Sequence, residues 1–166
     1  MEIKESLEQL KKSKPFIEWQ NHNKDSFFSY ALKMLEHDKE QPWEFGYYNK
    51  NTEKIASFVI EPEARMVNEE EAFKKPEEEI QPIDLEKVTL PFNDILSKAR
   101  DFHNQKYPAE RENKVIAILQ ALEGHDTVWN ITILTSSFKT LNMKIDPQTG
   151  KVLQHALESL MDIVRR

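Results

Sequence analysis

One ordered pattern occurs twice in this chain and constrains its fold more than any other feature. Trp43 opens a run of aromatic and β-branched residues that ends near Pro62, and Trp129 opens a similar run that ends at Pro147. Each run is divided by a short polar cluster, which is typical of a β-hairpin. Because the two spacings differ by one residue, the sequence predicts two copies of one α+β module.

A helical period precedes each predicted hairpin. In the first half, Asp25 is a candidate N-cap for a helix that reaches His37, with the apolar stripe Phe28, Ala31, Leu32 and Leu35. In the second half, Pro91 suits a first helical turn, and the apolar positions recur at helical spacing at Phe92, Ile95, Leu96, Ala99, Phe102 and His103. We therefore expect each hairpin to carry one packed helix.

Further elements are expected around this repeated core. Ile3, Leu7 and Leu10 predict a short amphipathic helix before Pro15. Residues 114–122 predict a buried strand, for which we expect no counterpart in the first half. Short helices are predicted after each hairpin, from Asn68 to about Lys75 and over a terminal stripe at Ala156, Leu157, Leu160, Met161 and Val164.

The acidity of the chain is concentrated in one segment. The formal net charge is −6, and residues 61–86 alone contain ten acidic and three basic residues. The segment also holds three prolines, so we predict a solvated connector over residues 76–86, between domains at 1–75 and 87–166. The nearly neutral remainder gives no basic surface for a phosphate backbone, which argues against nucleic-acid binding.

Several classes of chemistry lack their usual residues. The chain has no cysteine and only three glycines, which argues against thiolate metal sites and phosphate-cradling loops. His103, and the adjacent pair His125 and Asp126, show no spacing typical of a metal site or a catalytic triad. We predict no catalytic residue, metal or cofactor, and hence no enzyme. With no long apolar run or leader, we expect a soluble, cytoplasmic protein that does not bind membranes.

The run "KIDPQTGKVL" is the most motif-like stretch of the chain. Asp146, Pro147, Thr149 and Gly150 have the residue types of a tight turn, in which Asp146 accepts backbone hydrogen bonds and Gly150 takes a positive φ. A calcium loop would need alternating oxygen ligands, and only Asp146 is present. The sequence therefore favours a structural turn over a metal site.

Aromatic residues at alternate positions form the candidate partner-binding set. Trp43, Phe45 and Tyr47 are expected on one face of the first hairpin. A single helix must cover that face, so we expect a core, with an exposed aromatic patch for a partner as the alternative.

The second half, residues 87–153, resembles the PepSY family of small domains. The similarity rests on "LPFNDILSKARDFHNQKYP", "VWNITIL" and "MKIDPQTGKVL". The first half, residues 26–67, looks like a degenerate copy in which the turn glycine is missing. The resemblance implies a cystatin-like fold with a helix across an antiparallel sheet. It also implies a non-catalytic module, for which control of peptidases has been proposed in that family.

Together these patterns predict a non-catalytic module that binds a protein or a peptide. Sheet edges can accept an extended peptide, and the acidic connector can attract a basic partner. The alternative is a small-ligand-binding protein or an enzyme with a pocket between helix and sheet. A cleft that gathers His103, His125 or Asp126 with another carboxylate would favour that alternative. The oligomeric state is left open by the sequence.

Overall fold

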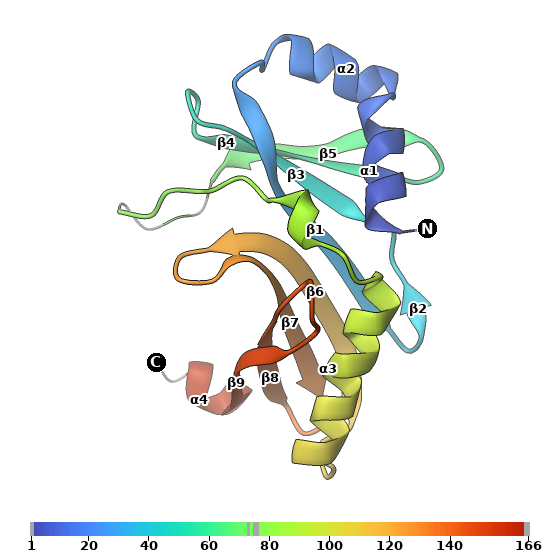
Figure 1. Ribbon diagram of the computed structural model, residues 1–166, viewed down its shortest axis with the longest axis vertical. Helices are drawn as coiled ribbons and strands as arrows, with labels where there is room; N and C mark the ends of the chain where they lie inside the picture. The colour runs from blue at the N-terminus through green and yellow to red at the C-terminus, as the bar shows by residue number, and fades with distance from the viewer. Residues whose placement is uncertain (1, 73, 75–76, 165–166) are drawn as a thin grey trace.

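Figure 1 shows the computed structural model of the chain, which describes residues 2–72, 74 and 77–164. Among these residues, nine strands form one antiparallel sheet in the order β5-β4-β3-β1-β6-β7-β8-β9, with β2 paired to β1 alone. The strands are β1 Ser26–Glu36, β2 Lys39–Glu40, β3 Glu44–Asn49, β4 Lys54–Ile60, β5 Ala64–Glu71, β6 Glu112–Leu122, β7 Asp126–Thr135, β8 Lys139–Ile145 and β9 Val152–Ser159. The helices are α1 Ile3–Lys11, α2 Lys14–Asn21, the 3₁₀ turn η1 Leu85–Lys87, α3 Phe92–Lys106 and α4 Leu160–Val164.

The centre of the sheet lies where the two halves of the chain meet. Residues 30–36 of β1 pair with residues 114–120 of β6, so the sheet continues without a break from one half to the other. The predicted α+β class is confirmed in this form, as helices packed on an antiparallel sheet. The division of the sheet into two copies of one module stays a prediction.

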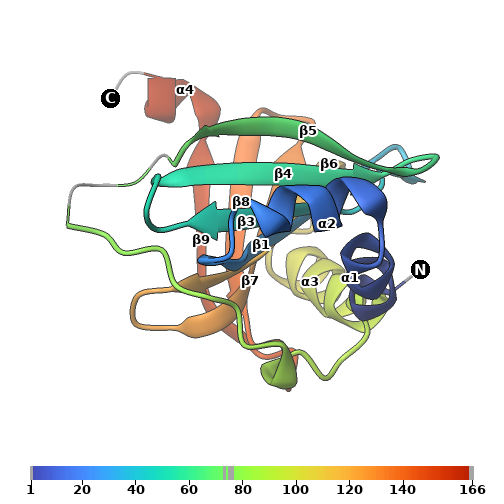
Figure 2. The same ribbon diagram turned by 90° about the horizontal axis from the view of Figure 1, so that it is seen from above.

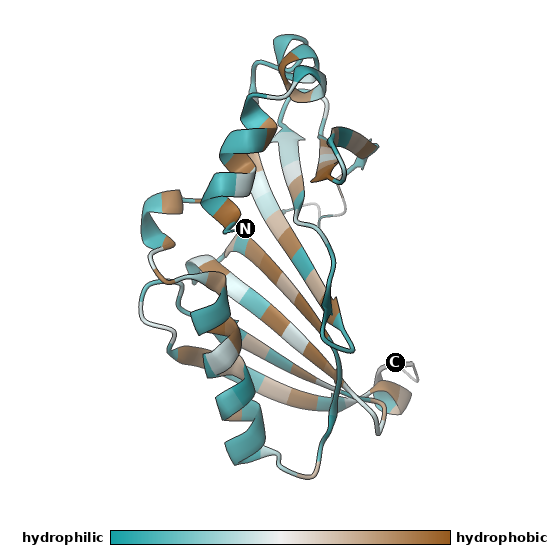
Figure 3. Cartoon of the chain, turned by 90° about the vertical axis from the view of Figure 1, so that its right-hand side faces the viewer, coloured by the Kyte–Doolittle hydropathy of each residue, from teal (hydrophilic) through white to brown (hydrophobic). Residues whose placement is uncertain are grey.

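One hydrophobic core lies between the sheet and a layer of helices. Helices α1, α2 and α3 lie along the same side of the sheet, as the side view and the view from above show (Figures 2 and 3). The aromatic residues that open the two hairpins meet in this core, because the rings of Trp43 and Trp129 lie 6.1 Å apart. The ring of Phe92 from α3 packs 5.2 Å from the first and 5.3 Å from the second. Aromatic contacts thus join the two halves beneath the helices.

Most elements with a clear period form as the sequence predicts. The helices α1 and α3, the hairpin of β3 and β4, the strand β6 and the hairpin of β7 and β8 all agree with the patterns. The Asn49–Thr52 polar cluster lies at the end of β3 and in the turn that follows it. Burial alternates regularly along β7 from Trp129 to Thr135, which is the period of a strand with one covered face.

The predicted helix from Asp25 to His37 is wrong, because these residues form β1. The side chains of Ala31, Lys33 and Leu35 are buried on the helix side, and those of Tyr30, Leu32 and Met34 are partly covered on the other. A strand that is apolar on both faces loses its period of two, and its apolar residues then match a helical stripe by coincidence. The first half therefore does contain a strand before its hairpin, contrary to our expectation.

Three further boundaries also differ from the prediction. The helix expected from Asn68 is instead the edge strand β5, and Lys75 and Pro76 lie outside the described residues. Pro15 does not end the first helical region, because it occupies the first turn of α2, where a missing N–H is tolerated. The strand β9 continues to Ser159, so the terminal helix begins at Leu160 instead of Ala156.

Candidate functional site

The sheet has a second face, on the side away from α1, α2 and α3, which we call the open face. Its residues alternate along the strands with those of the helix-covered core, and many are partly exposed, whereas Tyr48, Val59 and Val128 are buried. The partly exposed residues of the open face include Tyr30, Leu32, Met34, Glu44, Ile55, Ile116, Ile118, Gln120, Asn130, Thr132, Leu134, Asn142 and Lys144. These side chains come from six neighbouring strands and form the candidate site.

An apolar strip runs along the middle of the open face, at the junction of the two halves. Leu32 lies opposite Ile118, and Met34 lies opposite Ile116, in the antiparallel register of β1 and β6. Directly opposed side chains on one sheet face are in contact range, so these four form one surface. The strip offers an apolar contact area at the centre of the molecule.

On one side of the strip, the ring of Tyr30 lies against Gly46. A Cβ atom added at Gly46 would come within 1.9 Å of Cε1 of Tyr30, so only glycine fits beneath the ring. The Tyr30 hydroxyl donates to Oε1 of Glu44 at 2.6 Å and lies 2.6 Å from Oγ of Ser57. Burial, with the Glu44 carboxylate, raises the pKa of Tyr30, so the hydroxyl stays protonated at neutral pH.

On the other side of the strip lies a polar cluster. The Asn142 amide donates to Oδ1 of Asn130 at 2.7 Å and to Oγ1 of Thr132 at 2.9 Å. The Lys144 amine donates to Oδ1 of Asn130 at 3.2 Å and to Oδ1 of Asn142 at 2.5 Å. No ion pair joins Lys144 to another residue in the described part of the chain, and burial lowers the pKa of its amine.

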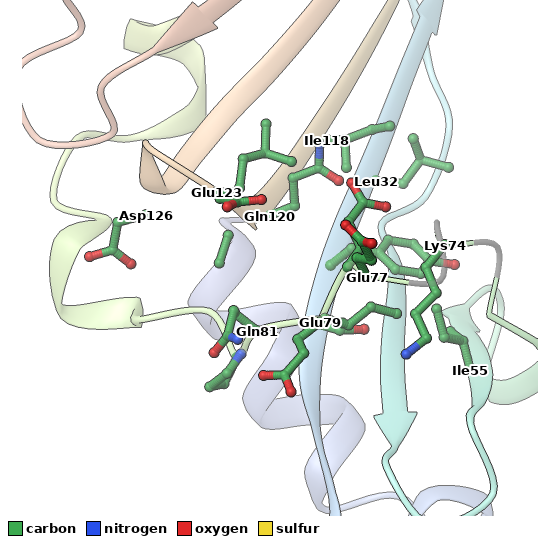
Figure 4. A pocket seen from close by; sticks show the side chains of 17 residues that line it. Leu32, Ile55, Lys74, Glu77, Glu79, Gln81, Ile118, Gln120, Glu123 and Asp126 are labelled. Carbon is green, nitrogen blue, oxygen red and sulfur yellow. The ribbon is translucent and has the colours of Figure 1, made fainter.

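Two cavities hollow the open face. The larger, of about 1040 Å³, lies between the strands and the segment that follows β5, and we call it the connector cavity (Figure 4). Its apolar lining includes Leu32, Ile55 and Ile118, and its acidic lining consists of Glu77, Glu78, Glu79, Glu123 and Asp126. The smaller, of about 360 Å³, adjoins Met34 and Lys114. Both hollows therefore lie on the side of the sheet that α1, α2 and α3 leave uncovered.

The connector is bound to the sheet at its C-terminal end. The Ile83 amide donates to the Phe28 carbonyl at 3.1 Å, and the Asp84 amide donates to Oγ1 of Thr127 at 2.9 Å. Gln81 forms an antiparallel bridge with Ala121. Glu77, Glu78 and Glu79 remain exposed, so this segment combines a fixed end with a solvated acidic stretch.

The candidate partner-binding aromatics lie on the opposite, helix-covered side. Trp43, Phe45 and Tyr47 are 5%, 0% and 3% exposed. Their rings belong to the core and are not presented at the surface of the folded protein. Burial raises the pKa of Tyr47, whose hydroxyl has no hydrogen-bond partner among the described residues.

The predicted turn residues lie together between β8 and β9. Oδ1 of Asp146 accepts from the amides of Gln148 at 2.8 Å and Thr149 at 3.3 Å, and Gly150 has a φ of +75°. Oγ1 of Thr149 accepts from the Lys151 amide. The Pro147 carbonyl accepts from the Leu90 amide at 3.2 Å, so the turn also holds the segment before α3 against the sheet.

The three polar residues named for the enzyme alternative do not meet one another, but Asp126 lines a cavity with other carboxylates, which is an observation that favours that alternative. His103 lies in α3 with Nε2 2.6 Å from the Glu110 carbonyl, whereas Nε2 of His125 lies 3.2 Å from Oε1 of Gln154. Asp126 does lie at the connector cavity with Glu123, but its carboxylate is paired with Lys87, which lowers its pKa. Within the described residues, no group of three or more His, Asp or Glu side chains is suited to hold a metal ion.

Sequence reasoning missed the open face as a site. Its residues come from strands that are distant in the sequence. The one available signal was that β1 and β6 carry apolar residues not only at the alternate positions that face the core but also at the positions between them. That signal was hidden because residues 26–36 match a helical stripe.

Comparison with known proteins shows a fold but no family. No protein-family model matches the sequence, and no curated protein matches it. The structure is similar to the crystal structure of a "putative lipoprotein" from Clostridium difficile, with a TM-score of 0.53 and 12% sequence identity. The similarity covers 86% of this chain and 89% of that one. No helix of the described residues is long and apolar enough to span a membrane.

Proposed function

We propose that this protein is a non-catalytic module that binds a protein or peptide partner on its open face. One observation carries the proposal: the side chains of six strands form a continuous, partly exposed surface with an apolar strip and a large cavity. Leu32, Ile116 and Ile118 leave apolar surface on the side of the sheet that the helices do not cover, and grouped apolar surface of this kind supports a contact site. Partner contact would bury the strip.

We also propose that the two halves are PepSY-like modules joined edge to edge. The order of elements supports this proposal, since α2 is followed by β1, β3, β4 and β5, and α3 by β6, β7, β8 and β9. The predicted cytoplasmic location stays a prediction, because the Clostridium difficile neighbour is described as a "putative lipoprotein". Peptidase control remains a function implied by the family resemblance.

The test is selection of displayed random peptides against the folded protein, followed by affinity measurement on two variants. Ile118→Arg places a charge in the apolar strip, whereas Ile17→Arg changes an apolar residue that is 45% exposed on α2. We expect selected peptides to bind Ile118→Arg at least about tenfold more weakly than Ile17→Arg. Thermal unfolding of both variants verifies that they are folded.

The small-ligand alternative predicts a different result. No selected peptide would then depend on Ile118, and a small metabolite would raise the melting temperature by several degrees. The cavities described above lie on the open face and not between helix and sheet, so such a ligand would bind at a place that the alternative did not predict.

A further inference from the structure

The connector cavity combines two kinds of surface. Its base includes the apolar pair Leu32 and Ile118, opposed across β1 and β6, with Tyr30 and Gln120 as the next opposed pair. Ile55 lines the cavity farther away on β4, which is separated from β1 by β3. Its border is acidic and comes from two separate segments, the connector and the turn between β6 and β7 (Figure 4). The acidic residues therefore surround an apolar base and do not form an isolated acidic cluster.

The charge of this border is largely uncompensated. Five acidic residues and one basic residue line the cavity. The one lysine, Lys74, is paired with Glu53, and Asp126 is paired with Lys87. No ion pair joins Glu77, Glu79 or Glu123 to any other residue that the structure describes. Three carboxylates thus face solvent at the border of an apolar cavity, where they create a negative potential.

We propose that the connector cavity binds a cationic segment of a partner protein in which lysine or arginine residues alternate with apolar ones. Such side chains have an apolar stem and a charged end, which matches an apolar base with an acidic border. An acidic segment would meet like charge, and a purely apolar one would leave the carboxylates without a partner. The inference rests on the proposed function, because it specifies the partner that the open face would bind.

The direct test uses three fluorescent probes of equal length and fluorescence anisotropy. The first peptide alternates lysine with leucine, the second alternates glutamate with leucine, and the third alternates lysine with serine. We expect the lysine–leucine peptide to bind at least about tenfold more tightly than either of the others. Affinity should fall as salt rises from about 50 to 500 mM, since the carboxylates are exposed.

Two triple variants locate the binding. The first variant removes the border charge and combines Glu77→Gln, Glu79→Gln and Glu123→Gln. We expect it to lower the affinity for the lysine–leucine peptide by about tenfold or more. The control, Glu5→Gln with Glu63→Gln and Asp101→Asn, removes the same charge from exposed positions elsewhere and should leave affinity within about twofold.

The outcomes separate this inference from the proposed function. Equal weakening by both triple variants would overturn the inference, because net charge would then explain binding. Selected peptides that depend on Ile118 but carry no positive charge would overturn it too, while the proposed function would stand. Competition by spermine would also overturn the inference if spermine displaces the peptide fully and the first triple variant weakens spermine binding as much as peptide binding. A small polycation would then be the ligand. If no probe and no selected peptide depends on Ile118, both proposals fail.

Discussion

Residues one position apart on the same strand have opposite environments in this protein. Ile131 of β7 is 0% exposed beneath the helices, whereas Thr132 next to it is partly exposed on the open face. The helix-covered face is lined by large aliphatic and aromatic side chains. The open face mixes an apolar strip with an amide and lysine cluster and acidic borders.

The difference concerns how much each face contributes to the stability of the fold. The covered face stabilises the fold, because complete burial of apolar side chains is the largest favourable contribution to folding. The open face contributes less to stability and keeps polar groups available at its edges, as at the rim of an interface. Each of the following predictions tests one part of this contrast.

The largest effect is expected from truncation on the covered face. Ile131→Ala should lower the free energy of unfolding by about 3 to 4 kcal/mol, through lost burial and a residual cavity. Ile118→Ala on the open face should lower it by about 1 kcal/mol, because part of that side chain already contacts solvent. Urea unfolding measures both values, and equal losses would contradict the contrast between the faces.

A smaller effect is expected where Tyr30 covers Gly46. Gly46→Ala should lower the free energy of unfolding by about 2 kcal/mol, because the new methyl group overlaps the ring. In a Tyr30→Ala background, the same substitution should cost about 0.5 kcal/mol or less. Gly124→Ala is the control, since Gly124 has a φ of +82° and open space around it, and its cost should not depend on Tyr30. If Gly46→Ala lowers the free energy of unfolding equally with and without Tyr30→Ala, the steric explanation is disproved.

The turn that links the helix layer to the sheet should contribute less. Asp146→Ala should lower the free energy of unfolding by about 1 kcal/mol through loss of the hydrogen bonds to the amides of Gln148 and Thr149. Gln148→Ala, at an exposed position of the same turn, is the control and should change the value by less than about 0.5 kcal/mol. A calcium-dependent rise in melting temperature that disappears in Asp146→Ala would show a metal site instead.

The smallest effect concerns Lys144 in the polar cluster. Because burial lowers the pKa of the amine below its ordinary value of 10.5, the unfolded chain binds the proton more tightly than the folded chain does. Stability should therefore rise as pH increases through the folded pKa toward 10.5, and Lys144→Gln should remove this rise. NMR titration of the amine and urea unfolding at several pH values measure it, with Lys151→Gln as an exposed control. A folded pKa at or above 10.5 would contradict the prediction.

The sequence predicted those elements whose two faces have different environments. In β7 and α3, the large, fully buried apolar side chains recur on one face, so a period of 2 or of 3.6 is visible, although Leu134 of β7 lies on the open face. In β1 that difference is absent, and the helical stripe at Ala31, Leu32 and Leu35 led to the wrong element. The edge strand β5 was missed because it is almost entirely exposed, and charged residues on an edge strand resemble a helix N-terminus in sequence.

The candidate site could not be predicted because tertiary structure creates it. The connector cavity joins Tyr30, Ile55, Glu77 and Ile118, which no sequence motif connects. Sequence composition did point to the connector part of its acidic border, since residues 61–86 contain ten acidic and three basic residues, but not to Glu123 and Asp126. It could not show that this segment crosses the strand ends and forms one wall of a cavity.

The pairing of β1 with β6 also has a consequence for how the chain folds. Its paired residues lie between 78 and 90 positions apart in the sequence, so a long loop must close before they meet. Each doubling of a flexible loop adds only about 0.6 kcal/mol to the closure entropy, but such distant contacts slow folding. Until closure, each half exposes the unpaired edge of a central strand. At high concentration, β1 of one copy can therefore pair with β6 of another, and the halves would be exchanged between chains.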